Sequence, residues 1–355
     1  MQQFLPRMEI ALAQIRHNAQ VLAKRYGQKG ISLMGVSKAT LGDPAVALAM
    51  VQGGVTAIAD SRIENIQRMQ AGGVVTRFVL LRSLFSRAET TVIYADISLN
   101  TELDTIAELA RYALLHGKIH QIIVMVELGD LREGVLPGDL AQFVKTVLTW
   151  PSIKLIGLGC NLACYGGIKP DRQKMQTLSD LTGAIEQEFH ISLSIVSGGN
   201  SANHDWYEST QDVGRINNLR LGESILLGRE TTSRRAIPGL YTDAFQLIAE
   251  VIESKDKPSL PYGEACQDSF GNLPVFHDRG IHHRAIVALG KQDTSIAGLT
   301  TDRDLEILGS SSDHTILDTG NHPLKIGSEV SFHLDYGGLL AAMTSPFIKV
   351  LTFDP

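Results

Sequence analysis

The chain contains few residues of the types that mark several whole classes of protein. It has only 3 cysteines in 355 residues, and aromatic residues make up 6%. A small, odd number of cysteines argues against a disulfide framework and favours a reducing compartment such as the cytoplasm. No apolar run approaches the roughly 20 residues that a membrane-spanning helix needs. The first residues include no apolar stretch followed by a small-residue cleavage site, so we expect no secretory signal.

The chain also has no strong excess of charge of one sign. The 32 Lys and Arg and the 38 Asp and Glu give a formal net charge of −6, which predicts no nucleic-acid or membrane partner. Hydrophobic residues at 44% and charged residues at 20% exclude collagen-like, coiled-coil and disordered classes. Cys160 and Cys164 have no second pair nearby and the histidines lack zinc-motif spacing, so we predict no metal site.

Apolar runs of strand length alternate with helical patterns over the first two thirds of the chain. The helical periodicity covers 11–26, 44–52, 62–70, 102–115, 138–148 and 172–189, whereas 83–90 shows no clear helix. Continuous runs rich in Ile, Val and Leu are typical of buried parallel strands. Eight such runs over about 230 residues fit a TIM-like (β/α)8 barrel, in the α/β class, better than an open sheet. The runs cover 31–36, 56–60, 77–81, 91–96, 121–128, 153–159, 193–200 and 217–222.

The pattern changes after about residue 240. Residues 255–274 are rich in Pro, Gly and polar side chains, and short β-type runs follow without a long helical period. This sequence pattern predicts a separate, mainly-β domain. We therefore expect a barrel over 1–239 and a C-terminal β-domain over 240–355.

Lys38 follows the first predicted strand. In a barrel the chemistry lies at the carboxyl ends of the strands, so its amine is expected to point into the barrel mouth. Desolvation there lowers the pKa of a lysine and makes it a nucleophile toward aldehydes and a usable base. The alternatives are a lysine whose stem packs on the wall while its amine stays in water, and a phosphate contact.

The sequence SGGNSAN (197–203) follows the seventh predicted strand. Its backbone N–H groups, with Asn200 and the Ser201 hydroxyl, can receive an anion, and the loops after strands seven and eight are a common phosphate site in barrels. Gly222 and Glu223 begin a predicted helix nearby. A tight turn that uses glycine only for its backbone freedom is the alternative. A lysine and a phosphate cradle in one barrel mouth together suggest pyridoxal phosphate.

Two arginines also lie at the predicted mouth. Arg132, in ELGDLREG, can bind the carboxylate of an amino acid through two hydrogen bonds. The alternative is a loop salt bridge with Asp130 or Glu133. Arg220 lies within an apolar strand and needs a partner, because an unpaired buried cation is costly. A structural pair with a carboxylate is the alternative for this residue.

Together these motifs resemble the fold-type-III pyridoxal-phosphate enzymes, the alanine racemase superfamily, and within it the alanine/ornithine racemase branch. The resemblance extends over nearly the whole chain, and it implies a barrel, a C-terminal β-domain and a homodimer in which the β-domain of one subunit completes its partner's site. The stretches that carry it are MGVSKAT (34–40), IADSRIENI (58–66), ELGDLREGV (127–135), GLGCNLACYGG (157–167), SGGNSAN (197–203), INNLRLGESILLGRE (216–230), GSSSDHTILD (309–318) and DYGGLLAAMTSP (335–346).

Site roles follow from the same resemblance. Lys38 matches the lysine that binds the cofactor as a Schiff base, and Arg132 matches the arginine that steadies this lysine and the substrate carboxylate. Ser201, Gly222 and Glu223 match the phosphate contacts, the last two through backbone amides.

Arg220 matches an arginine that faces the pyridine nitrogen. Related decarboxylases place a glutamate there, which keeps the ring protonated and makes it a strong electron sink. An arginine keeps the nitrogen neutral, because the guanidinium retains its own protons. The stretch LRLGES therefore favours racemisation over decarboxylation.

The second acid/base departs from the alanine racemase pattern. In those enzymes it is a tyrosine of the β-domain, but the similar stretch ALGKQDTS (288–295) has Lys291 and no tyrosine. We favour Tyr336 as the second catalytic residue, although each candidate also has a packing, surface or substrate-binding interpretation. The candidates are Tyr336, Cys266, His314, Asp313 and Lys291.

Carboxylates of the second domain bear on the substrate. Asp293 and Asp313, with His314 beside them, can receive a cationic side chain in a partly desolvated pocket, although surface carboxylates are the alternative. The sequence thus predicts a pyridoxal-phosphate-dependent racemase of ornithine or another basic amino acid that works by two-base Cα proton transfer. An alanine racemase, a decarboxylase on the same fold and a non-catalytic cofactor carrier are the alternatives, and such carriers lack a second domain.

Overall fold

The chain forms two compact units. The computed structural model describes residues 5–301, 305–320 and 322–354. One unit is Leu12–Thr242, and the other combines the residues up to Ala11 with those from Asp243 onward. Within the described ranges, none of the helices is both long and apolar enough to cross a membrane.

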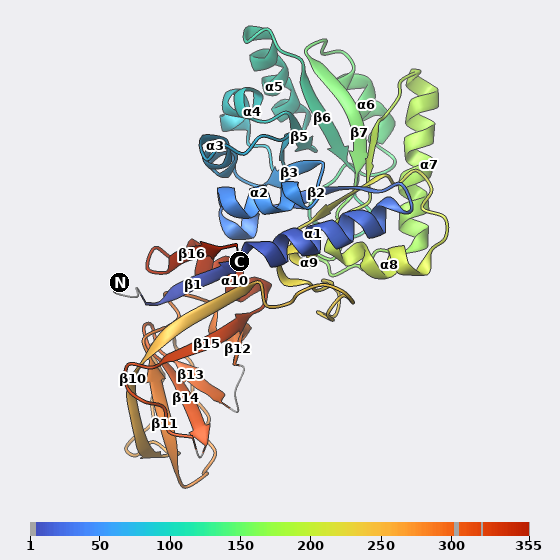
Figure 1. Cartoon of the computed structure of the whole chain (residues 1–355). Coiled ribbons are helices and arrows are strands. Elements are labelled where there is room, and N and C mark those ends of the chain that lie inside the picture. The colour runs from blue at the N-terminus through green and yellow to red at the C-terminus, as the bar shows by residue number, and fades with distance from the viewer. Residues whose placement is uncertain (1–4, 302–304, 321, 355) are drawn as a thin grey trace. The chain divides into compact units, whose positions relative to one another are not determined.

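The first unit is a closed barrel of eight strands (Figure 1). Each strand pairs in parallel with the next, and β2 closes the barrel by pairing with β9. The predicted TIM-like barrel is confirmed. Its strands are β2 (Ser32–Val36), β3 (Ala57–Asp60), β4 (Phe78–Leu80), β5 (Ile97–Asn100), β6 (His120–Met125), β7 (Ile153–Gly159), β8 (Ile195–Ser197) and β9 (Asn218–Leu221).

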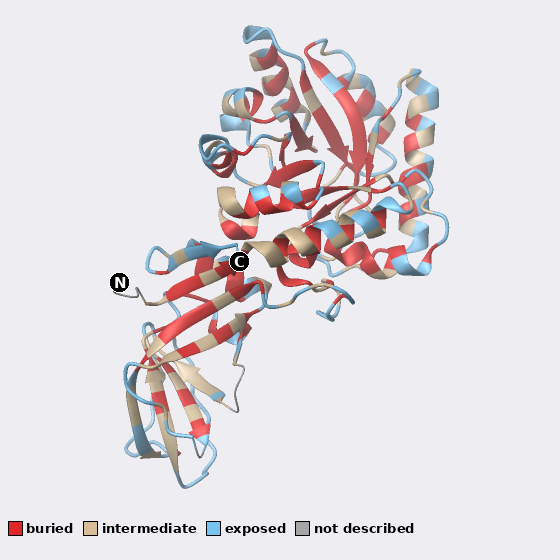
Figure 2. Cartoon of the chain, in the orientation of Figure 1, coloured by how far each residue is buried: buried red, intermediate tan, exposed pale blue. Residues whose placement is uncertain are grey.

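Helices surround the barrel and pack their apolar faces on it. Figure 2 shows that burial concentrates in the strands and on one side of the helices. Met34, Val79, Ile123 and Ile156 belong to the cluster that fills the interior, so the barrel has a packed core rather than a pore. The helices are α1 (Leu12–Gly27), α2 (Pro44–Gln52), α3 (Ile63–Ala71), α4 (Ala88–Tyr94), α5 (Leu103–Leu115), α6 (Leu140–Val147), α7 (Arg172–Phe189), α8 (His204–Ser209) and α9 (Glu223–Leu227).

The fourth strand lies elsewhere than predicted. Residues 91–96, expected to form a strand, belong largely to helix α4, and the strand is Ile97–Asn100. In α4 the buried Thr91 and Val92 follow the buried Ala88 by three and four positions, which is helical spacing. All four residues of β5 are buried. A short apolar run does not by itself distinguish a helix from a strand, and the barrel still has eight strands.

The second unit is an eight-stranded sheet in which β12, β15, β10, β11, β14 and β13 lie side by side in that order. β1 pairs antiparallel with β10 and parallel with β16. The other adjacent pairs are antiparallel, which confirms the predicted β character. The elements are β1 (Arg7–Ala11), β10 (Phe245–Pro258), β11 (Ile281–Val287), β12 (Leu299–Thr301), β13 (Glu306–Ser310), β14 (Thr315–Gly320), β15 (Glu329–Leu334), α10 (Tyr336–Thr344) and β16 (Lys349–Phe353).

Two features of this unit differ from the prediction. The strand Arg7–Ala11, assigned by sequence to the barrel domain 1–239, belongs to the sheet, because its alternating Met8 and Ile10 are fully buried there. Arg7 also forms two hydrogen bonds, of 2.7 and 2.8 Å, with the carboxylate of Glu329. Helix α10 was not expected, since two glycines obscure its start. Asp335 caps it by accepting a 2.7 Å hydrogen bond from the backbone of Gly338.

Candidate active site

Lys38 lies directly beyond β2, as the first residue of the 3-10 turn η1 (Lys38–Thr40). Its side chain is half-buried. Burial lowers the pKa of its amine, an electrostatic interaction with the Cys164 side chain opposes this shift, and the positive charge of Arg132 adds to it. Asp60 raises and Arg220 lowers the same pKa to a smaller extent. Groups from four barrel strands or their loops therefore act on this amine, which the structure makes easier to deprotonate than an ordinary lysine.

Asp60 secures the segment that carries Lys38. The Ser37 hydroxyl donates a 2.7 Å hydrogen bond to one carboxylate oxygen of Asp60. The other oxygen accepts from the Arg62 backbone at 2.9 Å and from the Asn65 amide at 3.0 Å. Burial nevertheless raises the pKa of this fully buried carboxyl. The ends of β2 and β3 are thus held together immediately before the lysine.

Arg220 is buried in β9 and is held by neutral acceptors. Its guanidinium donates to the Ser197 hydroxyl at 2.5 Å and to the carbonyl of Cys160 at 2.8 Å. Arg220 forms no ion pair with any carboxylate of the described residues. The structural salt bridge considered as an alternative for this arginine is therefore absent from that part of the chain. Burial lowers the pKa of this guanidinium. The side-chain nitrogen of the neighbouring Asn161 is buried and has no hydrogen-bond partner.

A line of hydrogen bonds continues from Arg220 toward the opposite end of the barrel. The Ser197 hydroxyl donates to the Asn218 side-chain oxygen at 2.8 Å. The Asn218 amide nitrogen then donates to the Ser32 hydroxyl at 3.2 Å. No role for Ser197 or Asn218 was predicted from the sequence. The available signal was a polar residue at the end of an otherwise apolar strand, because such a residue needs a buried partner.

The glycine-rich turn after β8 forms a compact, self-capped structure. Gly199 has φ 138°, and a Cβ there would lie 2.3 Å from the side-chain oxygen of Asn203. That oxygen accepts from the Asn200 backbone at 3.0 Å, while the Asn200 oxygen accepts from the Ala202 backbone at 2.8 Å. The short turn η3 (Ser201–Asn203) is therefore fixed at both ends.

Ser201 connects this turn to the start of α9. Its hydroxyl oxygen lies 3.0 Å from that of Ser224 and accepts from the Ser224 backbone at 3.1 Å. Gly222 precedes α9, and a Cβ there would lie 3.3 Å from the Cβ of Val36. The buried carboxylate of Glu223 accepts from Thr231 at 3.2 Å and from Arg234. The structure thus brings Ser201, Gly222 and Glu223 together, with the Glu223 side chain committed to protein partners.

Arg132 lies in the loop after β6 and is exposed. Its guanidinium bonds to the adjacent Glu133, so the salt bridge considered as an alternative is present. Buried Asp130 organises the loop by accepting from the backbones of Cys164 at 3.2 Å and Tyr165 at 2.9 Å. The loops after β6 and β7 are thereby joined, and Arg132 stays close enough to Lys38 to lower its pKa.

Four of the residues predicted in the second domain lie in two adjoining turns of the second unit. The backbones of Lys291 and Gln292 donate to the carbonyls of Ser311 and Ser312 at 3.0 and 2.9 Å. Asp293 is 5% exposed, accepts from Gly290 at 2.8 Å, and has a pKa raised by burial. Asp313 is exposed and bonds to His314 at 2.7 Å, a contact that lowers the pKa of the carboxyl. The residues brought together are Lys291, Asp293, Asp313 and His314.

Two other candidates of this unit lie in different surroundings. Tyr336 is half-buried at the first position of α10. Its helix adjoins the segment that carries Asp293, since the Thr294 hydroxyl donates to the carbonyl of Gly338 at 3.0 Å. Cys266 is exposed in the segment between β10 and β11, where its thiol lies 3.4 Å from the carbonyl of Gln267.

The fold defines a (β/α)8-barrel protein with an additional antiparallel unit. A family comparison is more specific, because residues 10–229 match the model "Alanine racemase, N-terminal domain". The chain belongs to this family. It is 39% identical over 349 residues to ornithine racemase of Acetoanaerobium sticklandii, with 97% of this chain and 98% of the relative covered. It is 38% identical over 347 residues to lysine racemase of Thermotoga maritima, with 97% of each chain covered.

Solved structures show the same fold at lower identity. The alanine racemase of Streptomyces lavendulae superposes with a TM-score of 0.77 at 16% identity, covering 100% of this chain and 98% of that one. The D-threonine aldolase of Filomicrobium marinum superposes with a TM-score of 0.74 at 15% identity, covering 96% and 88%. These likenesses confirm a barrel joined to a β-domain.

Proposed function

We propose that this chain racemises a basic amino acid, ornithine or lysine, with pyridoxal phosphate bound at the carboxyl-terminal mouth of the barrel. The observation that carries the proposal is the half-buried Lys38 at the barrel mouth. Burial lowers the pKa of its amine, and the charge of the buried Arg220 lowers it further. The substrate class follows the two relatives that match nearly the whole chain, an ornithine racemase and a lysine racemase.

The residues at this mouth fit pyridoxal phosphate. The buried nitrogen of Asn161 has no partner, which is the state expected of a donor that a bound polar group satisfies. When bound, pyridoxal phosphate withdraws electrons from the substrate and makes its Cα proton acidic. Lys38 would hold the cofactor covalently, and Arg220 would face the ring nitrogen. The Ser201 hydroxyl and the backbone before α9 would hold the phosphate, with Asn200 fixing the turn.

Lys38 would exchange a proton with the substrate Cα on one face. A lowered pKa supplies the neutral amine that accepts this proton. The Arg132 guanidinium would orient the substrate carboxylate, exchanging part of its bond to Glu133 for that contact.

The opposite face requires a second group, and we assign it to Tyr336. The Tyr336 phenol would donate a proton to Cα when the Lys38 amine has accepted one. In the reverse direction the Tyr336 phenolate would accept the Cα proton and the Lys38 ammonium would donate one. Asp293, Asp313 and His314 would surround the substrate's side-chain ammonium, because a carboxylate in a partly desolvated place favours a cation. The site would be completed in a homodimer, with Tyr336 of the partner subunit facing Lys38.

Proton exchange tests the reaction. The protein is purified with pyridoxal phosphate and incubated with each amino acid in deuterated water, while Cα exchange and chirality are measured. Ornithine or lysine should exchange and racemise, the Lys38→Ala variant should do neither, and Lys145→Ala, at an exposed lysine of α6, should behave as wild type. Three results would reject the proposal. Release of carbon dioxide would identify a decarboxylase, and fastest exchange with alanine would identify an alanine racemase. Absence of exchange with any amino acid would identify a non-catalytic cofactor carrier.

Subunit mixing tests the shared site. Lys38→Ala and Tyr336→Phe variants are each expected to be inactive. If the two residues come from different subunits, a hybrid dimer has one site with both native residues, so mixing should restore activity. Mixed samples that stay inactive after proven exchange of subunits contradict the shared site.

We also propose a cytoplasmic location, because all three cysteines are free thiols in the structure.

A further inference from the structure

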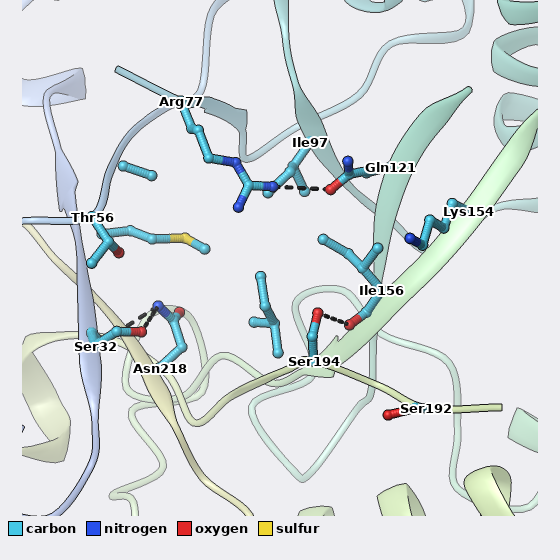
Figure 3. Close-up of a pocket in the computed structure, with 13 residues that line it drawn as sticks. Ser32, Thr56, Arg77, Ile97, Gln121, Lys154, Ile156, Ser192, Ser194 and Asn218 are labelled. Atoms are coloured by element: carbon cyan, nitrogen blue, oxygen red, sulfur yellow. Dashed lines mark hydrogen bonds between the residues drawn. The ribbon is translucent and has the colours of Figure 1, made fainter. Parts of the chain in front are cut away.

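A second opening lies at the amino-terminal mouth of the barrel, at the other end of the strands from Lys38. It is a cavity of about 420 Å³ lined by the first residues of several strands and by the residues that precede them. Figure 3 shows Arg77, Gln121 and Lys154 along one side of it. Nothing in the proposed racemase reaction uses this cavity.

These three side chains form a row of hydrogen-bond donors, in which Arg77 precedes β4 while Gln121 and Lys154 belong to the adjacent strands β6 and β7. Arg77 donates to the Gln121 side-chain oxygen at 2.9 Å, which leaves the Gln121 amide nitrogen to act as a donor. Gln121 of β6 and Lys154 of β7 are direct partners in the strand register. Ser192, in the segment before β8, also lines the cavity (Figure 3).

The two cations of the row have no carboxylate to neutralise them. Neither Arg77 nor Lys154 forms an ion pair with any of the residues that the structure describes, and no Asp or Glu of that part of the chain lines the cavity. Asp96, which precedes β5, directs an oxygen to the backbone of Phe78 at 2.7 Å. A concave surface with uncompensated positive charge concentrates small anions.

The other side of the cavity offers acceptors instead. The hydroxyls of Ser32, Thr56 and Ser194 donate to backbone carbonyls at 2.9, 3.0 and 3.3 Å. Their protons are thus already used, so these three cavity-lining hydroxyls can act toward a ligand only as acceptors. This division suits a small oxyanion that places its charged oxygens against the row of donors and a protonated oxygen, where it has one, against the hydroxyls.

We propose that the amino-terminal mouth of the barrel is a binding site for a small oxyanion, a free carboxylate or phosphate, held by Arg77, Gln121 and Lys154. The site is separate from the racemase centre and does not depend on the proposed reaction. Charge-assisted hydrogen bonds from a guanidinium and an ammonium supply the affinity.

Protection of the Lys154 amine tests the proposal. The cofactor-loaded protein, whose own phosphate cradle is then filled, is acetylated briefly at rising concentrations of inorganic phosphate, acetate or citrate, and the modified peptides are quantified by mass spectrometry. Phosphate or one of the carboxylates should slow acetylation of Lys154 but not of Lys145, an exposed lysine of α6. Sodium chloride at equal ionic strength should not, because screening alone lacks the directional contacts.

Two variants and a direct measurement complete the test. Arg77→Gln should raise the half-protecting concentration by roughly tenfold, the loss expected for one charge-assisted hydrogen bond, and Lys145→Gln should leave it unchanged. Isothermal titration of the same anions should lose its binding heat in the Arg77→Gln, Lys154→Gln double variant. Equal protection by sodium chloride, or equal affinity in wild type and double variant, would overturn the proposal. Protection by phosphate alone, or by carboxylates alone, supports it and identifies the source.

Discussion

Ser197→Ala removes the central link of the line that holds Arg220. The Ser197 hydroxyl accepts from the guanidinium at 2.5 Å and donates to Asn218 at 2.8 Å. Exposure is 0% for Ser197, 2% for Asn218 and 4% for Arg220, so water does not replace either bond. The variant leaves a buried cation with one acceptor fewer and a buried amide oxygen without its donor.

The magnitude follows from the two bonds. A hydrogen bond to a charged group contributes about 1.5–3 kcal/mol and a neutral one about 0.5–1.5 kcal/mol, so the loss should be about 2–4.5 kcal/mol in the free energy of unfolding. Ser152→Ala is the matched control. That hydroxyl is also buried, but it donates only to the carbonyl of Ala110 at 2.8 Å, so its loss should be about 0.5–1.5 kcal/mol.

Urea unfolding followed by tryptophan fluorescence measures this difference. The chain has 2 tryptophans, Trp150 and Trp206, and both belong to the barrel unit. The signal therefore reports the unit that contains Ser197 without a contribution from the sheet unit. If Ser197→Ala is no more destabilising than Ser152→Ala, the hydroxyl is not a significant acceptor for the guanidinium, and the reasoning is wrong.

Three other perturbations have defined outcomes. Gly199→Ala would place a Cβ 2.3 Å from a side-chain oxygen at a residue with φ 138°, so it should weaken cofactor binding and destabilise the fold. The control Gly117→Ala has φ 62° and open space around the added Cβ, so it should lose only about 1–2 kcal/mol of stability. Equal shifts of the two melting temperatures would contradict this expectation. Burial lowers the pKa of His120 to about 4, so as the pH falls the imidazole is protonated in the unfolded chain before it is protonated in the folded protein. Urea titrations should therefore show that the free energy of unfolding of wild type falls by up to about 3 kcal/mol, relative to His120→Gln, between pH 6.5 and pH 4. The lowered pKa of Lys38 means that the folded apo protein releases this proton before the unfolded chain does, so stability relative to Lys38→Met should rise with pH toward 10.5; a flat difference would refute the assignment.

Local patterning was sufficient for most of the barrel because each strand was both apolar and short. It failed at β5, where the apolar residues of α4 and the following strand are adjacent in sequence. It also failed at Arg7–Ala11, whose partners lie more than 200 residues away in β10 and β16. Which sheet a strand joins depends on the free edge that it finds, and a local pattern does not contain that information.

The candidate site shows the same division. Lys38 and Arg220 could be placed from sequence, because a residue at the end or inside of a barrel strand has a known direction. The line through Ser197 and Asn218 could not, because it depends on how β8 and β9 align; these two residues are direct register partners. In the second unit, the turns that carry Asp293 and Asp313 adjoin because the backbones of Lys291 and Gln292 donate to the carbonyls of Ser311 and Ser312.

The neutral partners of Arg220 leave its charge uncompensated, and this charge contributes to the lowered pKa of Lys38. The Arg220 charge lowers the pKa of the lysine, and a carboxylate beside the guanidinium would cancel part of this effect. Asn218→Asp places such a carboxylate one hydrogen bond behind Ser197, without a change of size. Competitive acetylation of the apo protein across pH should show the Lys38 midpoint shifted upward, yet still below 10.5, because burial remains the largest cause. An unchanged midpoint, in a variant that remains folded, would show that Arg220 does not act on the lysine through its charge.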